Sequence, residues 1–316
     1  GNLEQAANAL TQAETIDPEY VDAQYFQGIL AERLTRTEDA LARYQKAAEL
    51  DPSNSQYPVA AAEMLVDLNR VSEAKAYLIS CRSKFDHSAG ICQTLGHIAT
   101  LEGDHTAAAK LFYEATLLSP DDQDIAEDLA NANIALGKFA DAETTLARLV
   151  KDPANADRRD LQHLRARCLI QLQRPIEARQ IYFTLTADAQ GSSDVEAWIG
   201  LAELSHTLRD NPKLKTAATR LIAIAPERPD GYFFLGLYNK KTGNLRAAAE
   251  NFDKAVQVEG SPQNLMMLGM TLQEMGLTDD ARRCYTAAQQ LAPADPIPGQ
   301  LLGTLEGSTV AGVTTE

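Results

Sequence analysis

Histidine and cysteine are the residues of this chain that most often carry nucleophilic, acid–base or metal chemistry. The five histidines are dispersed along the 316 residues: His87, His97, His105, His163 and His206. None belongs to an HExxH pair, and the sequence contains no phosphate-binding glycine loop, no GxGxxG and no GxSxG. The pattern favours solvated or hydrogen-bonded histidines and predicts no catalytic residue, no metal site and no cofactor.

The four cysteines contain no CxxC pair, which argues against zinc and thioredoxin-type chemistry. Cys168 and Cys284 are separated widely and are predicted to be buried thiols. Cys81 and Cys92 stand near the end of one expected helix and near the start of the next, with a short turn between them. These two could form a disulfide, or they could be two separate buried thiols, and the sequence leaves both alternatives open.

The elements that hold these residues are defined by an internal repeat. An alanine, replaced once by leucine, recurs with a period of 34 residues, two slips of two residues and a last interval of 33, at Ala6, Ala40, Ala74, Ala108, Ala142, Ala178, Leu214, Ala248 and Ala281. A larger residue follows four positions later in most units, as at Tyr44 and Phe252, and another apolar residue follows three positions after that. Spacings of four and three place side chains on one face of a helix.

Prolines and glycines mark where the helices of each unit end. A proline follows the repeat alanine by twelve residues at Pro18, Pro52, Pro120 and Pro226, and it cannot continue a helix. Glycines at 103, 137, 243 and 276 are predicted to cap the first helix in the left-handed conformation. Twelve residues before each repeat alanine stands a further small residue, as at Gly236, which predicts close approach of the two helices.

These features resemble the tetratricopeptide-repeat (TPR) family. Its pattern is matched best by Leu235-Gly236, Gly243, Ala248, Phe252 and Ala255, and Trp198 occupies the family's tryptophan position. The resemblance covers about residues 1–295 and implies an all-α fold, a right-handed α-solenoid of about eight and a half helical hairpins.

The repeat pattern gives the predicted organisation of the chain. A half repeat spans 1–20 and is followed by full repeats at 21–54, 55–88, 89–122, 123–158, 159–194, 195–228, 229–261 and 262–295. Residues 151–158 and 187–194 are predicted to be longer loops. Residues 296–307 are predicted to form a C-terminal capping helix, and 308–316 a disordered tail. The opening half repeat leads us to expect further repeats or another domain upstream.

Composition limits the partners. The net charge of −15 argues against nucleic acid, since phosphate binding needs clustered lysine and arginine. No stretch is apolar enough to insert in a membrane. Arginine outnumbers lysine and alanine is abundant, which hints at a GC-rich bacterial gene. The sequence does not distinguish a periplasmic from a cytoplasmic location, and it does not indicate the oligomeric state.

In the TPR family the first helices line a concave groove, and the resemblance implies which positions face it. The second position of five units is acidic, at Asp22, Asp124, Asp160, Glu196 and Asp230. These residues form a possible acidic ridge selecting basic peptides, although an acidic first turn also favours the helix dipole. The carboxylate clamp of chaperone-binding relatives is missing, because its positions hold residues such as Tyr25, Glu63 and His97.

The last two repeats place apolar residues at groove positions, namely Phe233, Leu237, Met266 and Met270. An apolar patch with a polar rim marks a contact surface, and methionine adapts to varied partners. Asp230, Lys240 and Lys241 are the expected rim. The alternative is that these side chains point into the helix stack, or that the segment after Pro296 covers them.

The sequence therefore predicts a non-catalytic scaffold that binds a peptide or protein partner in its groove. Two other functions stay open. The chain could be an architectural subunit of a bacterial envelope or secretion assembly, or the regulatory arm of an enzyme whose catalytic domain lies outside it.

Overall fold

A computed structural model describes residues 3–85, 87–187 and 190–311, with side chains described up to Leu305. Two compact units, 1–157 and 158–316, are described separately below. The described residues form α-helices and two short 3-10 turns, with no strand among them. The predicted all-α fold of successive helices is confirmed.

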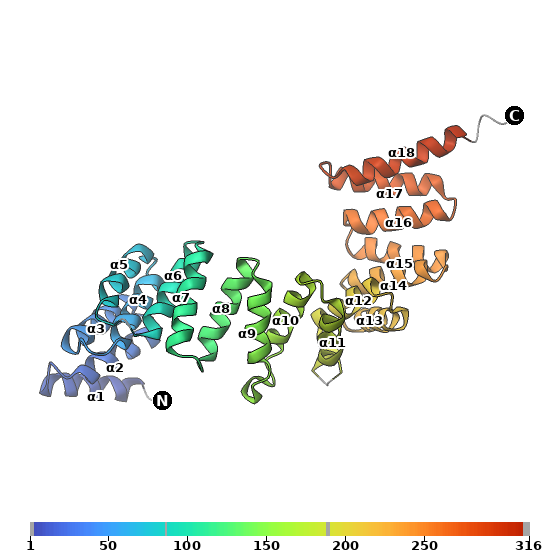
Figure 1. Cartoon of the computed structure of the whole chain (residues 1–316). Coiled ribbons are helices and arrows are strands. Elements are labelled where there is room, and N and C mark those ends of the chain that lie inside the picture. The colour runs from blue at the N-terminus through green and yellow to red at the C-terminus, as the bar shows by residue number, and fades with distance from the viewer. Residues whose placement is uncertain (1–2, 86, 188–189, 312–316) are drawn as a thin grey trace. The chain divides into compact units, whose positions relative to one another are not determined.

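The first unit contains nine α-helices within its described residues (Figure 1). In chain order they are α1 (Leu3–Ile16), α2 (Val21–Arg33), α3 (Thr37–Leu50), α4 (Gln56–Asp67), α5 (Val71–Arg82), α6 (Ala89–Leu101), α7 (His105–Leu118), α8 (Gln123–Ala135) and α9 (Phe139–Leu149).

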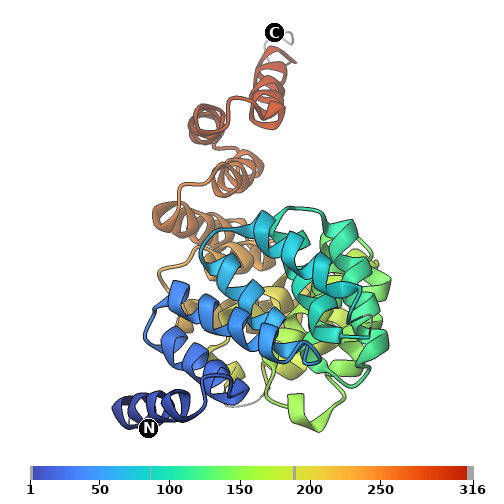
Figure 2. The ribbon, with the colours of Figure 1, turned by 90° about the vertical axis from the view of Figure 1, so that its left-hand side faces the viewer.

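The second unit likewise contains nine α-helices within its described residues. They are α10 (Arg159–Gln171), α11 (Pro175–Leu185), α12 (Val195–Thr207), α13 (Asn211–Ile224), α14 (Asp230–Lys241), α15 (Leu245–Val258), α16 (Pro262–Glu274), α17 (Thr278–Leu291) and α18 (Pro296–Ala311). Figure 2 shows several of the last helices nearly end-on, stacked one after another.

Proline ends the second helix of a pair as the sequence predicts. Helices α1, α3 and α7 stop two residues before Pro18, Pro52 and Pro120, and α13 and α17 stop two residues before Pro226 and Pro293. The residue that precedes a proline is driven out of helical geometry, which explains the constant offset.

The first helix of a pair ends in the left-handed conformation. Gly103, Gly137, Gly243 and Gly276 have φ between 72° and 81°, which confirms their predicted capping role. In other repeats the matching position holds a residue with a side chain, at Thr35, Asn69, Gln173 and Arg209, with φ of 57–59°. The turn is therefore kept even where glycine is absent.

The core of each unit follows the repeat alanines. Ala40, Ala74, Ala108 and Ala142 in the first unit, and Ala178, Ala248 and Ala281 in the second, are completely buried. Leu214, which replaces the alanine in one repeat, is also fully buried. Ala6 in α1 is an exception and is exposed, and α1 buries none of its residues.

The two longer connections are more ordered than simple loops. Residues 151–158 contain a 3-10 turn at Pro153–Asn155, where Asn155 Nδ2 donates to the Leu149 carbonyl at 2.9 Å. Residues 187–194 contain a second one at Gly191–Ser193, where Trp198 Nε1 donates to the Gly191 carbonyl at 2.8 Å. Residues 188 and 189 of this predicted loop lie outside the described residues.

The C-terminal helix α18 packs on α17 through Leu305, which is 2% exposed and contacts the cluster of Ala281 and Tyr285. Leu301 and Leu302 pack against the same cluster. The helix continues to Ala311, four residues into the segment predicted to be a disordered tail, so that part of the prediction is wrong. Residues 312–316 lie outside the described residues.

Candidate partner-binding site

The four apolar residues predicted to form a contact surface lie on α14 and α16 in the second unit. All four are half-buried, and they divide into two pairs. Phe233 and Met266 line a surface cavity. Leu237 packs against the hydrophobic clusters on both sides of α14, and Met270 packs against the cluster of Ala281, Tyr285 and Leu305. The pair Leu237 and Met270 therefore contributes mainly to helix packing.

The cavity has a volume of ≈ 530 Å³, and it opens beside the first turns of α14 and α16. Segments well separated in sequence build it: α12, the start of α14, the connection into α16, and the connection after α17. Its lining residues are Glu203, Pro229, Asp230, Phe233, Phe234, Glu259, Ser261, Pro262, Gln263, Asn264, Met266, Ala292 and Asp295.

Phe233 is held at the cavity wall by two other rings. Its ring centroid lies 5.7 Å from that of Phe234 and 5.8 Å from that of Phe252, and both contacts are edge-on. Edge-to-face packing is a favourable arrangement of aromatic rings. Phe252 is fully buried, so one side of Phe233 belongs to the core while the ring also lines the cavity.

Asn264 is a buried polar residue of the cavity lining that sequence reasoning missed. Its side chain is 5% exposed, and Nδ2 donates to the carbonyl oxygens of Glu259 at 2.8 Å and Ala255 at 3.4 Å. These bonds tie the end of α15 to the start of α16. The only sequence signal was Ser261 three residues earlier, whose Oγ caps the Asn264 amide at 3.2 Å.

All charged residues of the lining are acidic. Glu203, Asp230, Glu259 and Asp295 line the cavity, and no lysine, arginine or histidine is among its lining residues. Burial raises the pKa of Glu203 above its ordinary value, and the neighbouring charges of Asp230 and Glu196 raise it further. Like charges thus meet in a partly desolvated place, which is where an opposite charge from a ligand gains most.

The predicted lysine rim is located elsewhere. Lys240 Nζ lies 2.7 Å from Glu274 Oε1, and its side chain is largely buried. Lys241 is exposed. Burial is the main cause that lowers the pKa of the His206 imidazole, and the charge of Lys241 lowers that pKa further. Neither lysine lines the cavity. Both stand in the last turn of α14, whereas the cavity opens at the first turn.

The predicted acidic ridge is distributed over first turns in both units, as its spacing indicated. Asp22 and Asp124 stand in α2 and α8, and Asp160, Glu196 and Asp230 stand in α10, α12 and α14. In the second unit arginine neutralises much of this charge. Arg158 pairs with Asp160 at 2.7 Å.

Arg228 is the second of these arginines, and it pairs with two ridge residues. It lies 3.0 Å from Glu196 and 2.9 Å from Asp230. The three ridge residues of the second unit therefore each have an arginine partner, and Asp230 also belongs to the cavity lining.

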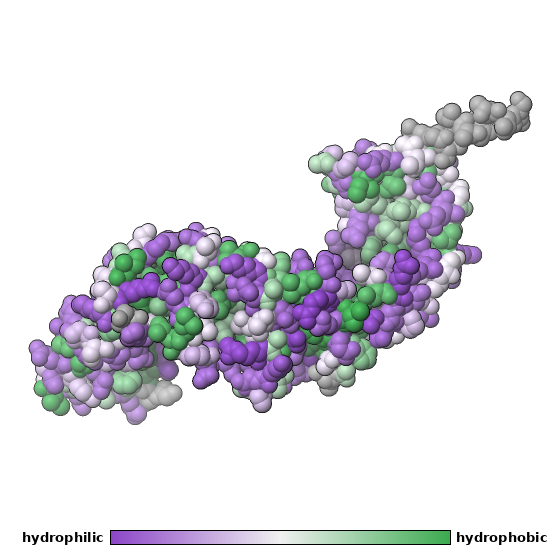
Figure 3. Space-filling view, in the orientation of Figure 1, coloured by the Kyte–Doolittle hydropathy of each residue, from purple (hydrophilic) through white to green (hydrophobic). Residues whose placement is uncertain are grey.

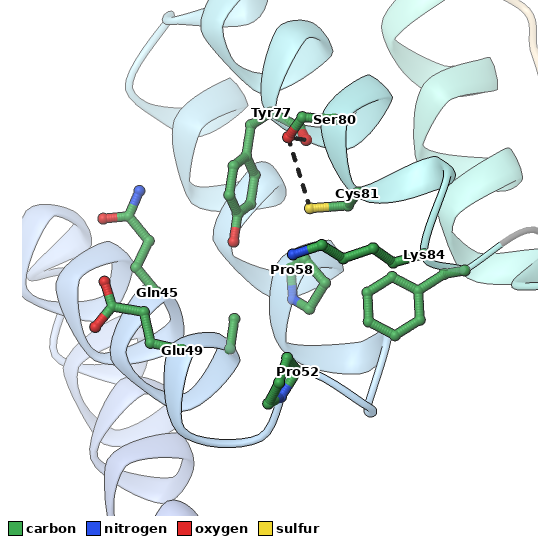
Figure 4. Close-up of a pocket in the computed structure, with 10 residues that line it drawn as sticks. Gln45, Glu49, Pro52, Pro58, Tyr77, Ser80, Cys81 and Lys84 are labelled. Carbon is green, nitrogen blue, oxygen red and sulfur yellow. Dashed lines mark hydrogen bonds between the residues drawn. The ribbon is translucent and has the colours of Figure 1, made fainter.

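A second cavity of ≈ 510 Å³ lies on the second helices of the first unit (Figure 4). Tyr77 and Cys81 of α5 and Lys84 surround it, opposite Pro52 and Pro58. Burial is the main cause that raises the pKa of Tyr77 to about 12. With Lys84 and Glu49 both in its lining, this cavity shows no preference for ligand charge.

Cys81 and Cys92 carry free thiols in the structure. Cys81 is half-buried and lines the cavity of Figure 4. Cys92 is 4% exposed and packs against Ala115 and Ile125, in a different cluster. Cys168 is buried as predicted, whereas Cys284 is only half-buried, so the prediction of a buried thiol is wrong for Cys284.

The histidines take part in local polar contacts. His97 Nε2 lies 2.8 Å from Asp128 Oδ2, and this hydrogen bond raises the pKa of His97 above its ordinary value. His163 Nε2 lies 3.1 Å from Asp194 Oδ2, which also pairs with Arg159 at 2.7 Å. Across the described residues, no group of three or more His, Cys, Asp or Glu side chains is arranged to hold a metal ion.

The character of the surface and the arrangement of the helices indicate the structural class to which this protein belongs. Figure 3 shows hydrophobic residues reaching the surface over the last helices, mixed with hydrophilic ones. No helix within the described part of the chain has the length and apolar character needed to cross a membrane. Successive antiparallel helix pairs with buried small residues are the architecture of an α-helical repeat protein.

Comparison with known families identifies the kind of repeat. Three tetratricopeptide-repeat models match the chain, at residues 1–55, at 99–168, and at 229–261 with 262–295. Together they cover more than half of it, and the chain belongs to the tetratricopeptide-repeat superfamily. Proteins of this superfamily in general mediate protein–protein interactions. No curated protein sequence matches the chain.

Solved structures show the same fold. The C-terminal part of a TPR protein from Cytophaga hutchinsonii is 13% identical over 77% of this chain and 99% of its own, with a TM-score of 0.61. PilW, a type IV pilus biogenesis factor, is 16% identical over 69% of this chain and 97% of its own, with a TM-score of 0.54. A TPR protein from Parabacteroides merdae is 17% identical over 79% and 98%, with a TM-score of 0.53. At these identities the likeness concerns the fold alone.

Proposed function

We propose that this chain is a non-catalytic scaffold that binds a peptide segment of a partner protein at the cavity between α14 and α16. The observation that supports this most is the ≈ 530 Å³ cavity lined by Phe233 and Met266. Ligand pockets in proteins commonly measure about 300–1,000 Å³ and combine apolar walls with a few polar groups. An aromatic ring and a flexible methionine beside such a pocket are suited to hold one side chain of an extended peptide.

The test needs a variant that alters the cavity and leaves the core intact. Phe233 contacts Phe234 and Phe252, and Met270 packs on Tyr285, so replacing either one also changes helix packing. Met266 lines the cavity and is the cleaner choice. Met275 at the end of the same helix, 36% exposed, is the matched control.

Peptides that bind the whole chain would be selected from a random twelve-residue display library. Their affinities would then be measured by fluorescence anisotropy against wild type, Met266→Ala and Met275→Ala. We expect Met266→Ala to weaken binding by about tenfold, the usual effect of truncating a contact at the centre of an interface. Met275→Ala should bind like wild type. Failure to select any peptide, or equal binding by both variants, would contradict the proposal.

A further inference from the structure

We infer that the cavity between α14 and α16 receives a cationic side chain, lysine or arginine, from the bound peptide. The charged group would lie among the carboxylates of Glu203, Asp230, Glu259 and Asp295, with its hydrocarbon stem against Phe233 and Met266. This inference rests on the proposed function, and it specifies the chemistry of the residue that the partner inserts.

The first argument is charge complementarity. The four carboxylates come from four separate places in the chain: α12, the first turn of α14, the connection before α16, and the connection after α17. They are therefore brought together by the packing of the repeats and do not form a charge run along one solvated helix. No cation in the cavity lining offsets them, and the nearby Arg228 pairs with Asp230 and Glu196.

The four carboxylates of the cavity lining differ in the hydrogen bonds and ion pairs that they already make. Asp295 accepts the backbone amide of Ile297 at 2.9 Å, and Asp230 pairs with Arg228 at 2.9 Å. Glu203 also lines the cavity, where burial is the main cause that raises its pKa and repulsion from Asp230 raises that pKa further. A cation bound beside Glu203 would relieve this repulsion, so Glu203 is the residue on which the binding of a cation should depend most.

The apolar side of the cavity fits the rest of such a side chain. Lysine and arginine carry a long aliphatic stem that packs on apolar surface while the charged head stays polar. The ring of Phe233 can also attract a guanidinium or ammonium group placed over its face. A neutral side chain would use only the apolar wall, and an acidic one would be repelled by the carboxylates.

A bound divalent cation is a different kind of occupant, and the geometry does not favour it. The four carboxylates do not form one of the close groupings that could hold a metal ion, and the described residues contain none. The cavity also has space and apolar walls that a bare ion would leave unused.

The experiment uses the five methionine methyl groups of the whole chain as NMR probes, after labelling with 13C. N-acetyl-arginine methylamide would be titrated first, then the corresponding citrulline compound, which has nearly the same shape and no charge. We expect the arginine compound to shift the Met266 signal, with affinity about tenfold higher than that of the citrulline compound. Added salt should weaken this binding, because it screens the carboxylates.

A pair of double variants assigns the effect to the cavity. Glu203→Gln with Glu259→Gln should bring the arginine compound to the affinity of the citrulline compound. Glu250→Gln with Asp279→Asn makes the same change of charge on α15 and α17, away from the cavity lining, and should leave binding unchanged. Equal binding of the arginine and citrulline compounds, or a loss of preference in both double variants, would overturn the inference.

The two experiments distinguish a failure of this inference from a failure of the proposed function. Selected peptides that depend on Met266 but contain no essential lysine or arginine would leave the peptide site standing and remove the cationic residue. A Met266 shift with the arginine compound, together with no peptide dependent on Met266, would support a cation site and contradict the proposed peptide scaffold.

Discussion

The ring of Phe252 in α15 lies against the backbone of Gly236 in α14, so that a Cβ atom at position 236 would be 2.6 Å from Cε1 of that ring. The same relationship joins Gly28 to Tyr44, Gly96 to Phe112 and Gly269 to Tyr285. Glycine therefore stands on the first helix where the second helix presents an aromatic ring. Where the ring is replaced by Leu78 or Leu146, the first helix carries alanine instead, at Ala62 and Ala130.

Tyr182 shows that the rule follows contact and not position. Its own repeat has Ala166 at the position of the glycine, and its ring lies instead against Gly200 of the next helix, α12, where a Cβ atom would be 2.5 Å from Cε2. The repeat that departs from the family pattern thus still provides a glycine for its aromatic ring.

The first prediction is that Gly236→Ala destabilises the chain by about 1–3 kcal/mol, because the added methyl group overpacks the contact with Phe252. Gly303→Ala is the matched control, since glycine 303 is also inside a helix and a Cβ atom there would meet nothing within 4 Å. It should be neutral or stabilise by up to about 1 kcal/mol. Thermal and urea unfolding followed by circular dichroism would measure both, and equal effects would contradict this explanation.

Much of the fold could be predicted from the sequence because its signals are local and repeated. Alanine spacing, a proline after several of the second helices and a glycine after several of the first helices depend only on nearby backbone, so Pro52 and Gly243 marked helix ends correctly. The pairing of Gly236 with Phe252 could be anticipated only as close approach of two helices. Which large side chain occupies the space depends on packing.

The candidate site was harder to predict for the same reason. Phe233 and Met266 were singled out by their register, but Leu237 and Met270 were singled out by the same register and pack, half-buried, against the core clusters. The carboxylates of Glu259 and Asp295 lie in connections, where the repeat gives no register. Their position beside Glu203 depends on how several repeats stack on one another. The local sequence pattern does not predict that stacking.

The second prediction concerns Thr35, which has φ of 57° at the end of α2. A β-branched residue is strained in this conformation, whereas glycine adopts it freely. We expect Thr35→Gly to raise the melting temperature, through a gain of up to about 1 kcal/mol. Asn69→Gly, at the equivalent place after α4, should have a smaller effect because asparagine tolerates the left-handed region. A lower melting temperature for Thr35→Gly would show that its side chain stabilises the turn.

The third prediction uses the thiols. A short pulse of iodoacetamide on the native chain, followed by peptide mass mapping, should label Cys81 before Cys92. Cys81 lines the cavity of Figure 4, whereas Cys92 is 4% exposed and burial raises the pKa of its thiol. The thiolate is the reactive form, so burial and a raised pKa both slow the reaction. After unfolding without reductant both should be labelled, and protection of both would instead indicate the disulfide.

The fourth prediction concerns the packing of α1 on α2 and α3 at Glu14. Its carboxylate accepts hydrogen bonds from Arg43, from Gln27 at 3.0 Å and from Gln24 at 3.1 Å. The bond from Arg43 is the largest cause that lowers the pKa of Glu14 to about 2. Helix α1 has no buried residue, so these polar contacts carry much of its attachment.

A lowered carboxyl pKa stabilises the folded chain at every pH above the pKa of the unfolded chain, about 4.3. As the pH falls below this value and approaches 2, the unfolded chain takes up the proton first, and the stabilisation is lost. We therefore expect the coupling between Glu14→Gln and Arg43→Gln in a double-mutant cycle to be present at pH 7 and to decline between about pH 4 and pH 2. Because both side chains are about a third exposed, the coupling should be about 1 kcal/mol or less. Hydrogen exchange of the α1 amides would report it locally, and a coupling that stays constant from pH 7 to pH 2 would contradict the assignment of this charge pair.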